Sequence, residues 1–451
     1  MPSAVYPLAL VLPRCFPKYL FHLGRMHAVA YRARIFGDNP LHKIFNDHWQ
    51  NFVGAYEERF QQTCGALRGT AKRVVKRFLD CGNPMNGFAR IKCSTCGAER
   101  LLHFSCKTRG FCPSCQARQS EEWAGWFADE LSESVFHRQM VFTIPKILRA
   151  YFHYDRKLLT ELSRAAHRAV SRFVEMTAGA GVRPAMAVVK HTFGEGVRFH
   201  PHLHALVTSG GWDRNRVWHP METWNQNVLR ELFEIEVFRF LRRGDLLRRE
   251  RMELIRSWPH SGFNVYVGGA VAPDDKTTLA RIARNMLRAP VVMSRIRYDR
   301  DQATVRIDPH GAHNEGCLDL DVLDFIARLT VQIPESHERL VHYYGLYSNA
   351  SRQRRVSNGR HETSACPADH SDGDESEWLK TRRIRWAKLI RQVWQEDPLL
   401  CPRCGGTMRI ISFITDGAVI DKILRHIGFG HADTPPPRYH PPPQLCRSLL
   451  G

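Results

Sequence analysis

Two cysteine pairs have the spacing of zinc-binding knuckles. Cys93 and Cys96 form one C-x2-C pair, and Cys112 and Cys115 form a second pair after fifteen intervening residues. Each pair places two thiolates on one turn, and a hairpin between the pairs would bring all four sulfurs around a tetrahedral zinc ion. The spacing therefore predicts a zinc ribbon. Because four cysteines leave no open coordination position, this zinc would be structural.

Further cysteines and histidines surround or follow this ribbon. Cys81, His103 and Cys106 could complete a second metal site, replace a ribbon ligand, or serve as ordinary packing residues. Cys401 and Cys404 form another knuckle whose second pair is missing, so that zinc and a metal-free turn are both consistent with it. The candidate partners of this last knuckle are His426, His431, His440 and Cys446.

A third group of potential ligands is the segment from Arg198 to Val207, which contains three histidines spaced by two. On a β-strand, residues two apart point to the same face, so His202 and His204 would project together. Two imidazoles so placed can hold a divalent ion with open positions, and that ion can polarise a phosphate for in-line attack. His200 shares the face but precedes Pro201. Packing histidines are the alternative, which the strand pattern and the basic character of the chain disfavour.

The elements that must position these residues follow from the periodicity of apolar side chains. Helices are predicted over 44–80 and from Trp123 to Leu131, before the histidine segment. The region that follows predicts strands at 139–144, 186–193, 202–207 and 263–267, and helices at 158–173 and 279–286. The second and third strands form a hairpin around the turn at 194–199. This pattern predicts an α+β fold with an antiparallel sheet and flanking helices, preceded by a helical and zinc-ribbon domain.

The composition favours a polyanionic partner. Of 451 residues, 65 are Lys or Arg and 45 are Asp or Glu, which gives a net charge of +20. Such an excess favours nucleic acid, because phosphate neutralisation releases counterions, although a solvated basic surface is the alternative. Around the knuckles, the residues suited to phosphate contacts are Arg90, Lys92, Arg100, Lys107, Arg109 and Arg118.

Two features of the sequence bear on where the protein works. No apolar run is long enough to cross a membrane, and the start of the chain lacks the basic region of a signal peptide. With clustered thiols, these features predict a cytoplasmic protein. The expected organisation is an extension over 1–35, a zinc-binding domain over 36–130, a core over 131–350, a flexible linker over 351–377, and a helix with a knuckle-like segment over 378–451.

Several of these segments resemble rolling-circle insertion-sequence transposases, the insertion-sequence ninety-one family of the HUH endonuclease group. They are Cys81–Arg90, Phe104–Cys115, His200–Val207, His342–Asn349 and Asp397–Gly405. The resemblance implies a zinc-binding domain, an HUH-type core sheet, and DNA partners that are single-stranded or hairpin ends of the insertion sequence. It also implies His202 and His204 as magnesium or manganese ligands. The family nucleophile is a tyrosine that forms a 5′-phosphotyrosine link with nicked DNA.

The sequence departs from the family at that tyrosine. The corresponding stretch is 283–290, in which the tyrosine position holds Asn285. Helical periodicity places Asn285 on the polar side with Arg281 and Arg288, which would stabilise phosphate charge, whereas an asparagine cannot form the covalent link. Tyr266 and Tyr298 are the nearest substitutes, and a further cluster comprises Tyr343, Tyr344 and Tyr347. Each could instead be a structural tyrosine with a hydrogen-bonded hydroxyl.

Three hypotheses follow. The protein is a metal-dependent nickase and strand transferase, or a DNA-binding relic that has lost the chemistry at Asn285. The third hypothesis is a zinc-ribbon transcription or RNA-processing factor in which the histidine strand is incidental.

Overall fold

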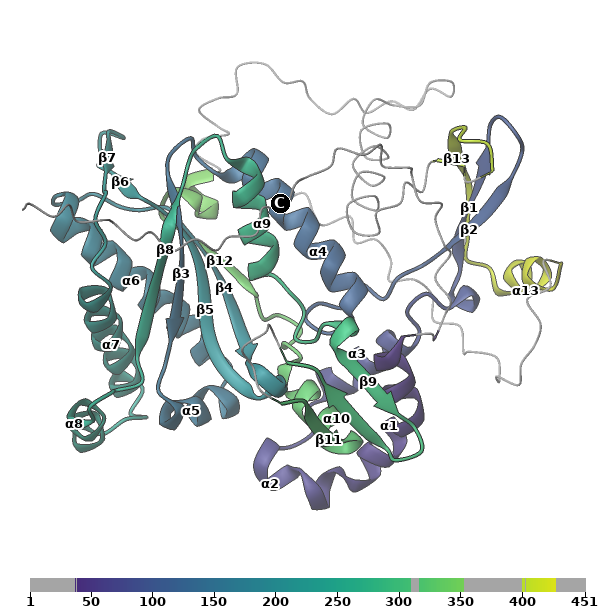
Figure 1. Ribbon diagram of the computed structural model, residues 1–451, viewed down its shortest axis with the longest axis horizontal. Coiled ribbons are helices and arrows are strands. Elements are labelled where there is room, and N and C mark those ends of the chain that lie inside the picture. Colours follow the sequence, from purple (N-terminus) through teal and green to yellow (C-terminus); the bar gives the residue numbers. More distant parts are fainter. Residues whose placement is uncertain (1–36, 38, 310–315, 353–399, 402, 427–451) are drawn as a thin grey trace, which may run out of the picture.

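The computed structural model describes residues 37, 39–309, 316–352, 400–401 and 403–426 (Figure 1). The extension, nearly all of the linker, and most of the predicted last segment, namely 378–399 and 427–451, lie outside the described residues. No described helix is both long enough and apolar enough to span a membrane.

A five-stranded antiparallel sheet forms the centre of the molecule, with the strand order β12-β4-β5-β3-β8. Its strands are β3 (His137–Thr143), β4 (Met186–Phe193), β5 (Phe199–Thr208), β8 (Asn264–Val271) and β12 (Val341–Tyr344). All four predicted strands are therefore confirmed, and β4 and β5 pair as the predicted hairpin. Every residue of β4 is buried, because helices cover both faces of the sheet at this point.

Two long helices, α6 (Leu158–Ala178) and α7 (Gln226–Arg243), pack against one face of this sheet (Figure 1). The alternating apolar residues of the strands, such as Phe142 and Leu203, bury themselves against this helical layer. Three shorter helices complete this side: η3 (Lys146–Leu148), α5 (Arg149–Tyr154) and α8 (Arg249–Ser257).

The other face of the sheet packs against α4 (Pro113–Trp126), the π-helical turn η2 (Phe127–Leu131) and α9 (Lys276–Met286). The predicted helices at these positions are confirmed. On α9, Leu279, Ala283 and Met286 are buried, as the apolar periodicity predicts. A small ribbon of β6 (Gly210–Trp212) and β7 (Trp218–Pro220) extends from the end of β5, and the turn η4 (Glu195–Val197) connects β4 to β5.

The first helices form a second core with elements that follow the sheet in sequence. The predicted helical region 44–80 is divided into α1 (Pro40–Arg59), α2 (Gln61–Cys64) and α3 (Gly69–Leu79), with a break at Gly65, whose φ of 73° is left-handed. These helices pack against α10 (Val322–Gln332) and a three-stranded sheet. That sheet comprises β9 (Ile296–Asp299), β10 (Thr304–Ile307) and β11 (Leu318–Asp321). The turn η5 (Met293–Arg295) precedes β9, and the turn η6 (Gly345–Tyr347) follows β12 later in the chain.

A third sheet stands to one side of these two cores (Figure 1). It has the strand order β13-β1-β2, with β1 (Phe88–Cys93), β2 (Glu99–His103) and β13 (Met408–Ile414) all antiparallel. The turn η1 (Pro84–Asn86) precedes it and α13 (Gly417–His426) packs beside it. With antiparallel sheets and packed helices, the predicted α+β class is confirmed.

Candidate active site and metal centres

Three histidines meet on the α9 side of the central sheet. His202 and His204 lie on β5, two residues apart, and His191 lies on β4 directly opposite His202. One ring nitrogen from each histidine can be chosen so that all three lie within 4.8 Å of one another. The sequence predicted the pair on β5 and left the third ligand open. The hairpin register supplies it, because residues directly opposite on an antiparallel pair point to the same face.

The hydrogen bonds of these histidines leave nitrogens free to converge. His191 Nε2 lies 2.5 Å from the carbonyl oxygen of Met286, and His202 Nδ1 lies 2.8 Å from that of His200. His204 Nδ1 faces the side-chain amide of Gln139 at 3.5 Å. The opposite nitrogens His191 Nδ1 and His204 Nε2 are buried without a hydrogen-bond partner among the described residues. Backbone carbonyls that fix one ring nitrogen while the other remains available are typical of metal-binding histidines.

Burial keeps these imidazoles neutral. It lowers the pKa of His202 to about 4 and the pKa of His204 to about 3, and it holds the pKa of His191 well below the ordinary value for histidine. The neutral imidazole is the form that donates a lone pair to a metal. Both the geometry and the electrostatics of the cluster therefore fit a divalent metal ion. His200, the third histidine of the segment, lies outside this group of three and contributes its carbonyl to His202.

A positive charge lies beside the histidine cluster. The guanidinium of Arg288 lies 5.7 Å from the ring centre of Phe193, and this ring stacks on His191 with 4.7 Å between centroids. The end of α9 is thus in contact with the cluster through Met286 and near it through Arg288. A phosphate group at the histidines would meet this charge.

The position expected for the tyrosine nucleophile is on the exposed side of α9. Asn285 and Arg281 are exposed, as helical periodicity predicts, and Arg288, two residues beyond the end of α9, is exposed as well. Asn285 immediately precedes Met286, whose carbonyl accepts the hydrogen bond of His191. The expected tyrosine position is therefore one residue from a backbone group that contacts the histidine cluster, but its side chain is an amide.

The candidate tyrosine nucleophiles differ in their exposure and in the contacts of their hydroxyls. Tyr266 on β8 is 52% exposed, and it is paired with Val141, which is in turn paired with His204. Because paired residues share a face, Tyr266 and the histidines lie on the same side of the sheet. Tyr298 lies on β9 of the small sheet, where its hydroxyl contacts His48 at 2.7 Å and Asp47 at 3.2 Å.

The three tyrosines of the further cluster named above have structural contacts. Their hydroxyls pair with interior side chains: Tyr343 with Trp123, Tyr344 with Ser163, and Tyr347 with His137.

The cysteines form two separate groups, which corrects the predicted ribbon. Cys112 and Cys115 converge with Cys81 and Cys106 rather than with Cys93 and Cys96. The reason is that the knuckle Cys93–Cys96 is itself the turn of the β1–β2 hairpin. β2 therefore carries the chain back, away from this knuckle, before it reaches Cys106.

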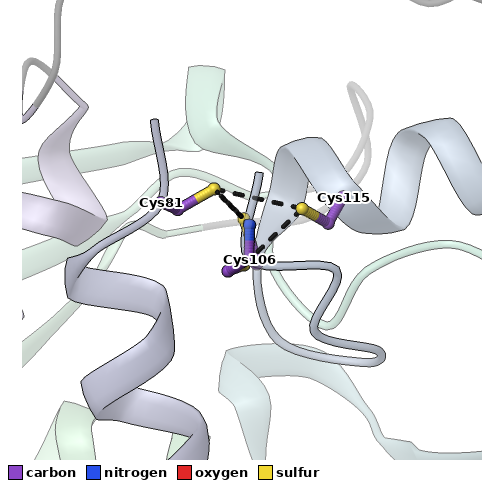
Figure 2. A group of neighbouring side chains, drawn as sticks. Cys81, Cys106 and Cys115 are labelled. Carbon is purple, nitrogen blue, oxygen red and sulfur yellow. Dashed lines mark hydrogen bonds between the residues drawn. The ribbon is translucent and has the colours of Figure 1, made fainter. Parts of the chain in front are cut away.

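The first group joins three parts of the zinc-binding region. Cys81 follows α3, Cys106 follows β2, and Cys112 and Cys115 lie at the start of α4. Figure 2 shows the sulfurs of Cys81, Cys106 and Cys115 directed toward one another. Their separations are 4.0 Å for Cys81–Cys115 and 3.5 Å for Cys106–Cys115. Four converging sulfurs at these distances fit a tetrahedral structural zinc ion. Cys81 and Cys106 thus belong to a site with the second knuckle, whereas His103 on β2 packs against Phe88.

The second group consists of Cys93, Cys96, Cys401 and Cys404. The sequence offered His426, His431, His440 and Cys446 as partners of the last knuckle, but its neighbours in the structure are the cysteines of the β1–β2 turn. His426 ends α13, and the other three candidates lie outside the described residues.

The basic residues near the knuckles have varied surroundings. Lys107 is exposed with a left-handed φ of 53°, and Arg109 donates a hydrogen bond to the carbonyl of Ser336 at 3.2 Å. Arg90 and Lys92 both pair with Glu99, which neutralises part of their charge.

Comparison with known proteins agrees with this architecture. Residues 44–144 match a family model described as a transposase zinc-binding domain, and residues 185–355 match one described as a putative transposase. The transposase for insertion sequence element IS801 of Pseudomonas savastanoi pv. phaseolicola is 25% identical over 389 residues, which are 82% of this chain and 88% of that protein. The putative transposase y4qJ of Sinorhizobium fredii (strain NBRC 101917 / NGR234) is 28% identical over 158 residues, 35% of this chain and 39% of that protein.

No solved structure matches the chain. The two family models together cover more than half of the sequence, which removes the hypothesis of an unrelated transcription or RNA-processing factor. The chain belongs to the insertion-sequence ninety-one family of transposases.

Proposed function

We propose that this transposase binds the ends of its insertion sequence and cuts and rejoins single-stranded DNA there, through a covalent phosphotyrosine intermediate. The observation that carries the proposal is the cluster of His191, His202 and His204, whose ring nitrogens converge and whose tautomers are fixed from outside. The net charge of +20 provides the general attraction to DNA.

The three histidines would hold magnesium or manganese. When bound there, a divalent ion would polarise the scissile phosphate and neutralise charge that develops on it. Because all three donors are imidazole nitrogens, the cluster should bind manganese more tightly than magnesium, which prefers oxygen ligands.

The protein's own groups orient this site and add charge to it. The carbonyls of Met286 and His200 and the amide of Gln139 keep the three rings in place. Arg288, which follows α9 and is held over Phe193, would stabilise negative charge on the phosphate, and Arg281 lies on the exposed side of α9. Lys107 and Arg109 would contact the DNA backbone beyond the cut.

Tyr266 is the side chain best placed to act as nucleophile. It lies two strands from His204 on the same face, about 10 Å away between α carbons. Its phenol oxygen would bond to phosphorus while the bond from phosphorus to the 3′ oxygen breaks. The phenol loses its proton, and the departing 3′ oxygen gains one. Tyr298 is less suited, because burial and the nearby Asp47 raise its pKa to about 12.

One observation favours a second candidate function, that of a DNA-binding relic. The resemblance puts Asn285 at the family's tyrosine position, next in sequence to Met286, whose carbonyl contacts His191, and an amide cannot form the covalent link. In this case the protein would still bind insertion-sequence ends without cutting them.

Covalent capture distinguishes the two functions. The protein is incubated with manganese and labelled single-stranded DNA from the insertion-sequence ends, and a covalent protein–DNA band is sought on a denaturing gel. We expect a band that Tyr266→Phe removes and that the matched variant Tyr298→Phe retains. If no band forms although the protein shifts the DNA in a binding assay, the second candidate function, a DNA-binding relic, is supported. A band gained only by Asn285→Tyr would place the lost nucleophile on α9.

A further inference from the structure

The two knuckles of the second cysteine group have the same local structure. In each, a glycine follows the second cysteine with a left-handed φ, 72° at Gly97 and 71° at Gly405. The glycine N–H donates to the carbonyl of the first cysteine, at 3.1 Å from Gly97 to Cys93 and 2.8 Å from Gly405 to Cys401. The second cysteine group therefore consists of two turns of the same geometry, about 300 residues apart in the sequence.

Backbone N–H groups point at the sulfurs of these turns. Thr95 and Cys96 donate to Cys93 Sγ at 3.4 and 3.5 Å, and Gly406 donates to Cys404 Sγ at 3.4 Å. Such donors stabilise thiolates, the form in which cysteine binds metal.

The sulfurs of the two knuckles lie at the spacing of a tetrahedral zinc site. Cys93 Sγ lies 3.5 Å from Cys404 Sγ, and Cys96 Sγ lies 3.6 Å from Cys401 Sγ. A zinc–sulfur bond of about 2.3 Å implies sulfur separations of about 3.8 Å in a tetrahedron. The observed separations are close to this value and far longer than a disulfide bond of about 2 Å.

Hydrogen bonds and packing around the two knuckles also hold them together. Ser94 donates to the carbonyl of Thr407 through its N–H and its hydroxyl, both at 3.0 Å. A β carbon on Gly406 would lie 2.4 Å from Thr95 Oγ1, so a larger residue at this position would force Thr95 to move. β13 then pairs with β1 along its length, and Ile420 and Leu424 of α13 pack on Phe88.

We propose that the transposase holds a second structural zinc at Cys93, Cys96, Cys401 and Cys404, and that this zinc fastens the C-terminal segment 400–426 to the zinc-binding domain. The ligands that it joins are separated by 305 and 311 positions in the sequence. The zinc would therefore link the two ends of a chain segment that contains all five strands of the central sheet. Cys401 and Cys404 lie beyond the residues matched by the zinc-binding family model. Loss of this zinc would release the C-terminal segment without removing the zinc at Cys81, Cys106, Cys112 and Cys115.

Zinc counting on the full chain tests the assignment. We expect two zinc ions per chain by elemental mass spectrometry. Cys93→Ser/Cys96→Ser, Cys401→Ser/Cys404→Ser and the quadruple variant should each retain one, because both knuckles belong to one site. The control Cys317→Ser, at an exposed cysteine outside both groups, should retain two. Two zinc ions in Cys401→Ser/Cys404→Ser, or none in the quadruple variant, would overturn the proposal.

Thiol labelling provides a measurement that needs no variant. During chelator titration of the wild-type protein, Cys93, Cys96, Cys401 and Cys404 should become reactive together, at a chelator concentration different from that of the first group. Independent exposure of the two knuckles would contradict a shared ion. A protein that is dimeric with its zinc and monomeric as Cys401→Ser/Cys404→Ser would place the site between two chains and overturn closure within one chain.

Discussion

At the scale of single residues, the histidine cluster depends on one side chain that spacing along β5 does not reveal. His191 completes the ligand set from β4, and its other ring nitrogen is held by Met286. His191→Ala should therefore weaken manganese binding by more than the roughly 10–100-fold that removal of an outer-shell partner costs. Calorimetric titration with manganese measures this change. His200→Ala is the matched control, and an equal loss in that variant would show that the histidines act through packing.

Arg288 should affect cleavage rather than metal affinity. Its guanidinium lies beside the cluster over Phe193 and contributes charge without being a ligand. Arg288→Ala should slow single-turnover cleavage by about 10²–10³-fold, the usual loss when a group that stabilises developing charge is removed. Manganese affinity should stay unchanged. The same rate for Arg288→Ala and wild type would exclude a role for this arginine in the cut.

At the scale of elements, the register of β12 against β4 depends on a glycine. Gly345 follows β12 with a φ of 59°, and a β carbon there would lie 1.9 Å from the carbonyl oxygen of Pro184. Gly345→Ala should lower the free energy of unfolding by more than about 1 kcal/mol, as both strain and overlap oppose it. Chemical denaturation measures this. Gly269→Ala on β8, where nothing lies within 4 Å, should have little effect, and similar values for both variants would contradict the prediction.

At the scale of the whole molecule, two properties can be measured without any substitution. The first is the stabilisation by zinc, since the cysteine groups join segments that are distant in sequence. Chelation should lower the thermal unfolding midpoint, because a site absent from the unfolded chain contributes its binding free energy to folding. Differential scanning fluorimetry with and without chelator measures the midpoint. An unchanged midpoint after verified zinc removal would exclude a structural role.

The second whole-molecule property is the salt dependence of DNA binding. With a net charge of +20, the protein should contact several phosphates of a single-stranded end. Six such contacts would reduce the affinity roughly 100-fold or more between 50 and 200 mM salt. Fluorescence anisotropy across this range gives the slope. A flat salt response would show that the charge is dispersed over the surface and does not serve DNA binding.

The sequence alone determined what depends on neighbours along the chain. The shared face of His202 and His204 follows from strand geometry, the knuckle turns from their cysteine spacing, and the exposure of Asn285 from helical periodicity. Only the tertiary structure decided which cysteines share a site and which histidine joins the pair on β5. Those choices depend on the pairing of β4 with β5 and of β1 with β13, and the latter strands are separated by more than 300 residues. Ligand spacing cannot reveal such partners, because they are set by strand register and by packing of the whole fold.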